Sequence, residues 1–239
     1  MSEKYWDAQL ETLPIERRRL LQDHRLRWQV RRCWDGSPFY RARLEAAGID
    51  PVTFHGLADL QRIPILRHSD LPSPDRHGDP SPEWTIAPEV WWQDREYSDV
   101  GLTRILTDGD VTQRAHLAAR ARWAAGIRPV RSLSAMAAEE PPPRALAIPG
   151  VAPSIAYPCG ESEGVHWSDD HFLIEIVDPD PGRSTSPGER GAVVVTDLAR
   201  EESPLLRYWT DLEANLFDEP CACGRTSARS TVIRPLANG

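Results

Sequence analysis

The sequence predicts an α+β fold with a helical N-terminal half and a small β-rich C-terminal half. The run Ile15 to Trp34 contains neither Gly nor Pro, as expected of a long helix. The run Glu139 to Pro143 breaks this helical pattern, and short apolar runs rich in β-branched residues follow it. Helices that precede strands along the chain, without alternating with them, are typical of α+β proteins.

Three further helices are expected in the N-terminal half. Ser37-Pro38 opens a helix from Phe39 to Ala47, because Pro is favoured in a first helical turn. A short helix is expected from Gly56 to Gln61. The clearest pattern runs from Asp110 to Ala125, with Asp108 or Asp110 as the cap and Gly126 as the stop.

The C-terminal half is expected to contain three strands, Phe172–Val177, Ala192–Thr196 and Leu205–Thr210, with turns at Pro181-Gly182 and Pro187-Gly188. We therefore divide the chain into a helical part (1–138), a Pro-rich connection (139–153) and a β-rich part (154–239).

Composition excludes several classes of protein. The chain has 239 residues, a net charge of −8 and 40% hydrophobic residues, which indicates a soluble globular protein. An acidic protein lacks the basic surface that nucleic-acid binding requires. No apolar run is long enough to span a membrane, and the polar N-terminus is unlike a signal peptide. We expect a cytoplasmic location.

Four residues form the strongest candidate site: Cys159, His166, Cys221 and Cys223. Three thiolates and one imidazole are a common closed ligand set for tetrahedral zinc. Cys221 and Cys223 are too close in sequence for an easy mutual disulfide, and small residues around them allow both sulfurs to face one point. The spacing is not a common zinc-finger pattern, so the alternative stays open that Cys159 is a core residue and His166 a loop residue.

These residues lie in motifs that resemble the phenylacetate–CoA ligases. The segment Tyr157 to His166, with Asp169-Asp170-His171-Phe172 after it, is similar to a block of that family. Pro204 to Tyr208 and Cys221 to Thr226 resemble two later motifs. Near the N-terminus, Tyr5-Trp6-Asp7, Pro38-Phe39-Tyr40 and Ile63-Pro64-Ile65 resemble the family's opening helices. The resemblance implies a remnant of the N-terminal domain of an adenylate-forming ligase, with zinc on the three Cys and one His.

The chain also departs from the family's pattern. The resemblance places a phosphate-binding loop at Ser98 to Arg104, but this segment has one Gly, no Lys and an Asp. A Pro-rich stretch between Ala135 and Ala156 replaces a long α/β segment of the family, and the sequence ends before its lysine-bearing C-terminal domain. ATP is therefore not expected as a cofactor.

Two nucleotide-contacting positions are implied by the resemblance. Glu163 matches a glutamate that helps to bind magnesium, and Asp211 matches an aspartate that holds ribose hydroxyls, although the usual glycine beside it is missing. Acidic loop residues are commonly solvated, so both could equally be surface residues with local hydrogen bonds.

Three functions follow from these residues. The first is an ATP-independent reaction of secondary metabolism on an aryl or acyl substrate such as a thioester, carried by Glu163, Asp170, His171 and Arg207. His171 has the ordinary pKa best suited to acid–base work at neutral pH, whereas a four-ligand zinc ion is structural by default. The second is a non-catalytic accessory protein whose Arg-rich helix binds a ligase, an acyl carrier protein or a pathway enzyme. The third is a minimal adenylating ligase. A second copy of the chain could also cover exposed apolar surface, giving a homo-oligomer.

Overall fold

The computed structural model describes residues 4–86, 94–98, 101–128, 141–178 and 185–236. The helices in these ranges are α1 (Ala8–Glu11), α2 (Ile15–Gly36), α3 (Pro38–Ala46) and α4 (Asp108–Ala124), with 3-10 turns η1 (Gly56–Arg62) and η2 (His68–Asp70). The expected helices at 15–34, 39–47 and 110–125 are therefore present, and the short helix at 56–61 is a 3-10 turn.

The helix starts follow from side-chain caps. Ser37 accepts a hydrogen bond from the backbone of Tyr40 at the start of α3. The cap of α4 is Thr107, one residue before the expected Asp108. Its hydroxyl accepts from the Asp110 backbone, and the Asp110 carboxylate accepts from the Thr107 backbone. This reciprocal capping box satisfies two backbone donors that would otherwise lack a partner.

The strands form three antiparallel sheets. β1 (Asp94–Tyr97) and β2 (Thr103–Leu106) form a hairpin. The second sheet has the order β3 (Leu146–Ile148), β4 (Ala152–Pro158), β5 (Val165–Trp167) and β9 (Arg229–Ser230). The third has the order β10 (Ile233–Pro235), β8 (Tyr208–Ala214), β7 (Gly191–Asp197) and β6 (Phe172–Val177), so β6 lies at its edge.

Strand bounds agree with the sequence analysis for β6 and nearly so for β7. The third expected strand, at 205–210, was placed too early, because β8 begins at Tyr208. Arg207, directly before β8, has a positive φ of 49°, a left-handed conformation outside the β region of backbone angles. The expected turn at Pro181-Gly182 lies outside the described residues.

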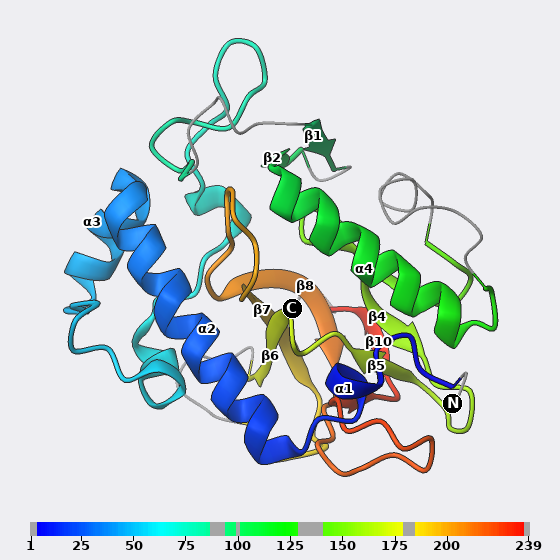
Figure 1. Cartoon of the computed structure of the whole chain (residues 1–239). Helices are drawn as coiled ribbons and strands as arrows, with labels where there is room; N and C mark the ends of the chain where they lie inside the picture. Colours follow the sequence, from blue (N-terminus) through cyan, green and yellow to red (C-terminus); the bar gives the residue numbers. More distant parts are fainter. Residues whose placement is uncertain (1–3, 87–93, 99–100, 129–140, 179–184, 237–239) are drawn as a thin grey trace.

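The helices lie on either side of the strands (Figure 1). Helix α4 packs against β4, and α2 packs against α3 and η1. A parallel bridge joins Leu66 to Tyr208, so the segment after η1 adds to the third sheet. The described part of the range 139–153 contains β3 and the start of β4, and this range therefore contributes to a sheet.

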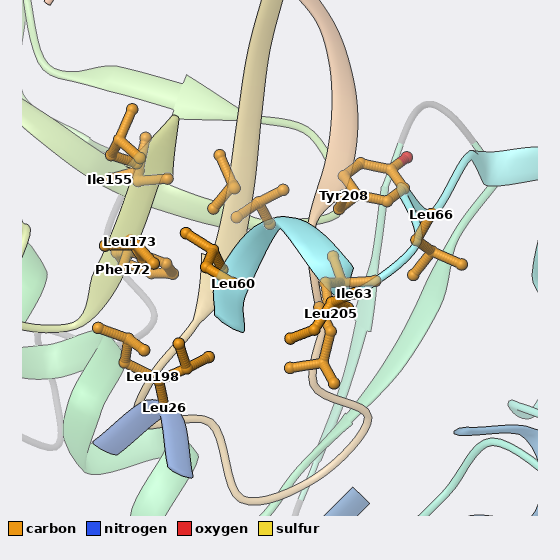
Figure 2. Close-up of a cluster of buried hydrophobic side chains, with 14 of the residues drawn as sticks. Leu26, Leu60, Ile63, Leu66, Ile155, Phe172, Leu173, Leu198, Leu205 and Tyr208 are labelled. Carbon is orange, nitrogen blue, oxygen red and sulfur yellow. The ribbon is translucent and has the colours of Figure 1, made fainter. Parts of the chain in front are cut away.

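One large hydrophobic cluster holds these layers together. It contains Leu26 from α2, Leu60 from η1, Ile155 from β4 and Phe172 from β6 (Figure 2). Both halves of the chain thus share a core, and the fold is α+β as expected. In the described residues, the N-terminal half of the sequence contains the β1–β2 hairpin as well as the four α-helices. None of the described helices is both long enough and apolar enough to cross a membrane.

Candidate metal centre

The structure brings together the four candidate metal ligands. The Sγ atoms of Cys159, Cys221 and Cys223 and a ring nitrogen of His166 all lie within 4.8 Å of one another, and all four residues are buried. Cys159 follows β4, and His166 lies on β5. The other two cysteines lie on a turn far along the chain. The alternative in which His166 is an exposed loop residue is therefore wrong.

Local backbone geometry places each ligand. Gly164, in the loop between Cys159 and His166, has a φ of 92°, and a Cβ there would lie 2.1 Å from the carbonyl oxygen of Ser230. Only glycine fits this approach of the loop to β9. In the other turn, the Gly224 backbone donates to the Cys221 carbonyl at 2.8 Å, which folds the turn so that both sulfurs face the cluster.

The distances fit a tetrahedral zinc ion. Zinc bonds of about 2.3 Å to sulfur and 2.0–2.1 Å to nitrogen separate two sulfurs by about 3.8 Å and a sulfur from a nitrogen by about 3.6 Å. The Sγ atoms of Cys159 and Cys221 are 3.6 Å apart, and Cys223 Sγ lies 3.3 Å from His166 Nε2. Three soft thiolates with one imidazole are also a donor set that zinc favours.

Neighbouring groups orient the imidazole. Nδ1 of His166 lies 3.2 Å from the carbonyl oxygen and 3.1 Å from the hydroxyl of Ser227. A proton on Nδ1 can be donated to that carbonyl, which leaves Nε2 free to bind a metal. Burial lowers the pKa of His166 to about 4. The imidazole is therefore neutral at pH 7, the state that a ligand requires.

Polar contacts also surround the sulfurs. Ser162 donates a hydrogen bond to Cys159 Sγ at 3.1 Å and lies 3.4 Å from Cys221 Sγ. Burial raises the pKa of a thiol, but at Cys221 the hydrogen bonds, Ser162 first, outweigh it and lower the pKa to about 7. At Cys223 burial prevails and raises the pKa to about 11.

Two of the proposed catalytic residues, Asp170 and His171, lie together at the start of β6. The Asp170 carboxylate accepts two hydrogen bonds from Arg120 of α4, at 2.6 and 2.8 Å. Burial favours the neutral acid, yet His171 and Arg120 hold the pKa of Asp170 well below its usual value. Burial lowers the pKa of His171 to about 4 despite the Asp170 carboxylate 3.4 Å away. Asp170 is thus held in an internal ion pair.

Arg207, the third proposed catalytic residue, lies apart from this pair. Its guanidinium donates to both carboxylate oxygens of Glu175, at 2.9 and 3.0 Å, and to the Ile63 carbonyl at 2.7 Å. Burial raises the pKa of Glu175, and Arg207 opposes that shift. Both side chains line a cleft of about 850 Å³. Through its hydrogen bonds, Arg207 connects β6 and the start of β8 to the segment after η1.

The two residues matched to nucleotide contacts are exposed. Glu163 lies in the loop between Cys159 and His166. Asp211 lies on β8 with a positive φ of 56°, and its carboxylate accepts a hydrogen bond from the Trp209 indole at 2.8 Å. Neither residue lines the cleft that contains Arg207, so the structure does not gather the proposed site residues into one centre.

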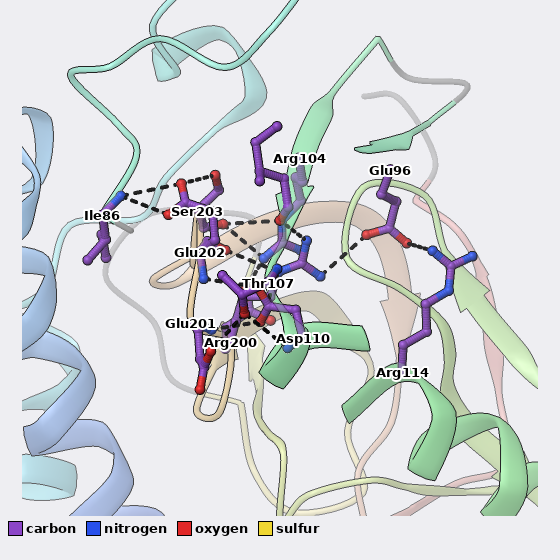
Figure 3. A network of polar contacts seen from close by, with 12 residues as sticks. Ile86, Glu96, Arg104, Thr107, Asp110, Arg114, Arg200, Glu201, Glu202 and Ser203 are labelled. Atoms are coloured by element: carbon purple, nitrogen blue, oxygen red, sulfur yellow. Dashed lines mark hydrogen bonds and ion pairs between the residues drawn. The ribbon is translucent and has the colours of Figure 1, made fainter. Parts of the chain in front are cut away.

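A carboxylate of the chain lies at the N-terminus of α4, directly after the segment matched to a phosphate loop. A Cβ on Gly109 would lie 2.3–2.4 Å from the Glu201 carboxylate group, which also accepts from the Thr107 hydroxyl at 2.7 Å. Asp110 accepts from the backbones of Glu201 and Glu202, at 2.7 and 3.1 Å (Figure 3). A helix N-terminus attracts anions, and here the chain supplies them itself.

The sequence analysis did not predict which arginines pair with Asp169 and Asp170. Arg120 pairs with Asp170, and Arg18 lies 3.0 Å from Asp169. Burial raises the pKa of Asp169 to about 7, although Arg18 opposes the shift. Arg120 lies among alanines of α4 that are buried. A charged residue on a buried alanine face indicates an internal partner, and this signal was available in the sequence.

Comparisons with known proteins agree with the fold. None of the protein-family models compared with the chain matches it. The phenylacetate-coenzyme A ligase of Thermus thermophilus is 28% identical over 323 residues, which cover 94% of this chain and 71% of the relative. The Escherichia coli enzyme of the same name is 30% identical over 125 residues, which cover 50% of this chain and 27% of the relative.

Solved structures of 2-hydroxyisobutyryl-CoA ligase are similar in fold. One in the postadenylation state, in complex with R3-HIB-AMP, gives a TM-score of 0.81 at 20% identity and covers 98% of this chain and 71% of that structure. An open conformation in complex with 2-HIB-AMP and CoA gives 0.80.

The Thermus alignment is longer than this whole chain of 239 residues. The relative therefore has residues inside the aligned span that have no counterpart here. Sequence similarity along 94% of the chain, the shared ligase fold and the motifs around the cysteine cluster point to the same relationship. The chain is a homologue of the phenylacetate-coenzyme A ligases, shorter than the relatives it matches.

Proposed function

We propose that this ligase-like chain holds a structural zinc ion, does not form acyl adenylates and acts by binding a partner. The observation that carries the proposal is the Glu201 carboxylate against Gly109 at the N-terminus of α4. A triphosphate at this helix end would meet that carboxylate and the Asp110 carboxylate, and like charges at short range repel. A phosphate group therefore finds its favourable position already filled by anions of the chain.

A zinc ion would be structural at this centre. Cys159, His166, Cys221 and Cys223 complete a four-ligand set, so zinc would have no open position for water or substrate. When bound, the ion would crosslink the β4–β5 loop to the 221–223 turn. Ser227 and Ser162 would then orient the imidazole and hydrogen-bond the thiolates.

The internal ion pairs favour binding over catalysis. Asp170 is engaged by Arg120, and Arg207 is engaged by Glu175. A side chain that already pairs with a buried partner cannot act on a substrate without leaving that partner's buried charge unpaired, which is costly.

Two measurements on the same sample test the proposal. The chain is purified without added metal and its zinc content is measured, and ATP with magnesium is titrated into it by calorimetry. We expect about one zinc per chain, as four ligands require, and no heat of ATP binding. Cys223→Ser should lose the zinc, whereas Cys33→Ala, outside the cluster, should retain it. Zinc-free protein contradicts the structural ion, and clear ATP binding contradicts the loss of adenylation.

One observation favours a second candidate, an ATP-independent reaction on an aryl or acyl thioester. The cleft beside Arg207 and Glu175 has a volume of about 850 Å³, within the usual range for small-molecule sites. Release of CoA from phenylacetyl-CoA, followed by a thiol reagent, tests it. Turnover that disappears in Arg207→Lys but persists in Arg31→Lys, an exposed arginine on α2, would support catalysis. Absence of turnover would leave the binding role.

A further inference from the structure

The cleft of about 850 Å³ follows the free edge of β6. Residues from Ile174 to Asp178 line it in succession, together with Leu216, Glu219 and Arg19. Consecutive strand residues point to opposite faces of a sheet, so a cleft that contacts all of them must wrap around the strand edge. This shape suits an extended chain lying beside β6.

The register of β6 shows which backbone groups face the cleft. The Leu198 backbone donates to the carbonyl of His171, so the odd-numbered residues hydrogen-bond toward β7. The even-numbered residues Ile174 and Ile176 therefore turn their backbone groups away from β7. The Thr185 hydroxyl donates to the Ile176 carbonyl at 2.5 Å, which agrees with this orientation.

Part of this edge has no partner among the residues that the structure describes. The N–H and C=O of Ile174 and the N–H of Ile176 form no hydrogen bond with residues 4–86, 94–98, 101–128, 141–178 and 185–236. Unpaired groups of this kind on an edge strand form a template for an added strand. A strand paired with Ile174 would regain two hydrogen bonds there.

Charge decides which strand fits. Five carboxylates line the cleft, from Glu175, Asp178, Glu189, Asp218 and Glu219, against the guanidinium groups of Arg19 and Arg207. Glu175 pairs with Arg207 and Asp218 with Arg19, so the negative charge available to an occupant comes chiefly from Glu189 and Glu219. This charge favours a basic occupant and disfavours carboxylates and the phosphates of CoA. It also disfavours a second copy paired edge to edge, because the two acidic clefts would then face each other. Ile65, Ile174 and Leu216 add apolar contact surface.

We propose that the cleft binds an extended basic segment of a partner protein, which adds as a strand to the edge of β6. Main-chain hydrogen bonds at Ile174 supply the pairing, and alternate side chains reach the two sides of the edge. This proposal rests on the binding role proposed above and names the chemistry of the partner. It requires no contribution from the metal centre.

Fluorescence anisotropy with the full chain tests the proposal. The probe is a labelled octapeptide of alternating lysine and valine, and the first control is the same peptide N-methylated at every second residue, in both registers. Loss of the pairing hydrogen bonds should weaken binding about tenfold in one register. A peptide of alternating glutamate and valine should bind at least as weakly as the N-methylated peptide. Equal binding of all these peptides would overturn strand addition.

Matched protein variants locate the binding. Glu219→Gln removes one carboxylate from the cleft and should weaken the lysine–valine peptide about threefold, whereas Glu45→Gln, an exposed glutamate on α3, should not. A dimer in sedimentation that the peptide cannot dissociate, or displacement of the peptide by phenylacetate, would assign the cleft to another occupant and overturn the proposal. A zinc-loaded protein that binds neither ATP nor the peptide would refute this inference and leave the zinc and ATP parts of the proposed function standing.

Discussion

Replacing Arg104 by methionine should destabilise the protein strongly. Arg104 lies on β2 and is fully buried. Its guanidinium donates to the carbonyls of Gly150, Val151 and Ser203 at 2.9–3.1 Å, and to the Asp197 carboxylate at 2.5 Å. One side chain thus connects the β1–β2 hairpin to three later segments, and Figure 3 shows its contact with Ser203.

The magnitude follows from the partner that remains. Methionine fills similar space but leaves the Asp197 carboxylate, 1% exposed, without its cation. Removal of one member of a buried ion pair costs about 3–5 kcal/mol. For a chain of this size that corresponds to a fall in Tm of about 10 °C. Asp197→Asn in the Arg104→Met background removes the unpaired charge and should recover part of the loss.

The same hairpin offers the control. Arg95 on β1 also pairs with an aspartate, Asp79, at 2.5 Å, but 47% of its side chain is exposed. Arg95→Met should change the free energy of unfolding far less than Arg104→Met does, because exposed pairs are well solvated. Urea denaturation of the variants, followed by circular dichroism, measures the difference. Equal free energies of unfolding for Arg104→Met and Arg95→Met would show that the hairpin does not bury Arg104 as described.

Three further predictions concern the metal, pH and the backbone. A zinc chelator should lower Tm, and zinc at 100 times its Kd should contribute about 2.7 kcal/mol; an unchanged Tm after complete removal would contradict a structural ion. Burial holds the pKa of His171 at about 4 against 6.5 unfolded, so its contribution is present above pH 6.5 and is lost as pH falls toward 4. The stability advantage of the wild type over His171→Asn should shrink by as much as about 3 kcal/mol across that window, and equal pH profiles would refute this. Gly164→Ala should cost at least about 2 kcal/mol more than Gly48→Ala in chemical denaturation, because both have positive φ but only Gly164 would place a Cβ against backbone; equal costs would contradict the tight loop.

Patterns of local sequence predicted the elements that depend on local chemistry. The Gly- and Pro-free run became α2, and the alternation at Phe172–Val177 became β6. The four candidate metal ligands were recognised because thiolates and an imidazole are rare and chemically specific, and the structure brings them together. Strands β4 and β5 were missed, since Ala, Ser and Pro weaken the alternation in β4 and only three residues form β5.

Long-range ion pairs could not be predicted from spacing. Arg120 and Asp170 are 50 residues apart, and Arg104 and Asp197 are 93 apart. A sequence shows that a charged residue lies in an apolar context, but only the packing of α4 and β2 against the sheets selects its partner. The same limit applies to the expected catalytic residues, which were grouped as residues near the expected zinc.

The Arg-rich helix shows how this packing changes a functional expectation. Several arginines of α2 were candidates for docking an acidic carrier protein. Arg25 donates to the Asp170 carbonyl, and Arg32 donates to the carbonyls of Arg200 and Glu201. Arg27 and Arg31 pair with aspartates on the same helix. Guanidinium groups that are already paired within the protein attract an external acidic partner only weakly, because the paired charges largely cancel at a distance. Arg25 and Arg32 thus fasten α2 to the β-rich half, and the acidic cleft at the edge of β6 is the better place to seek a partner.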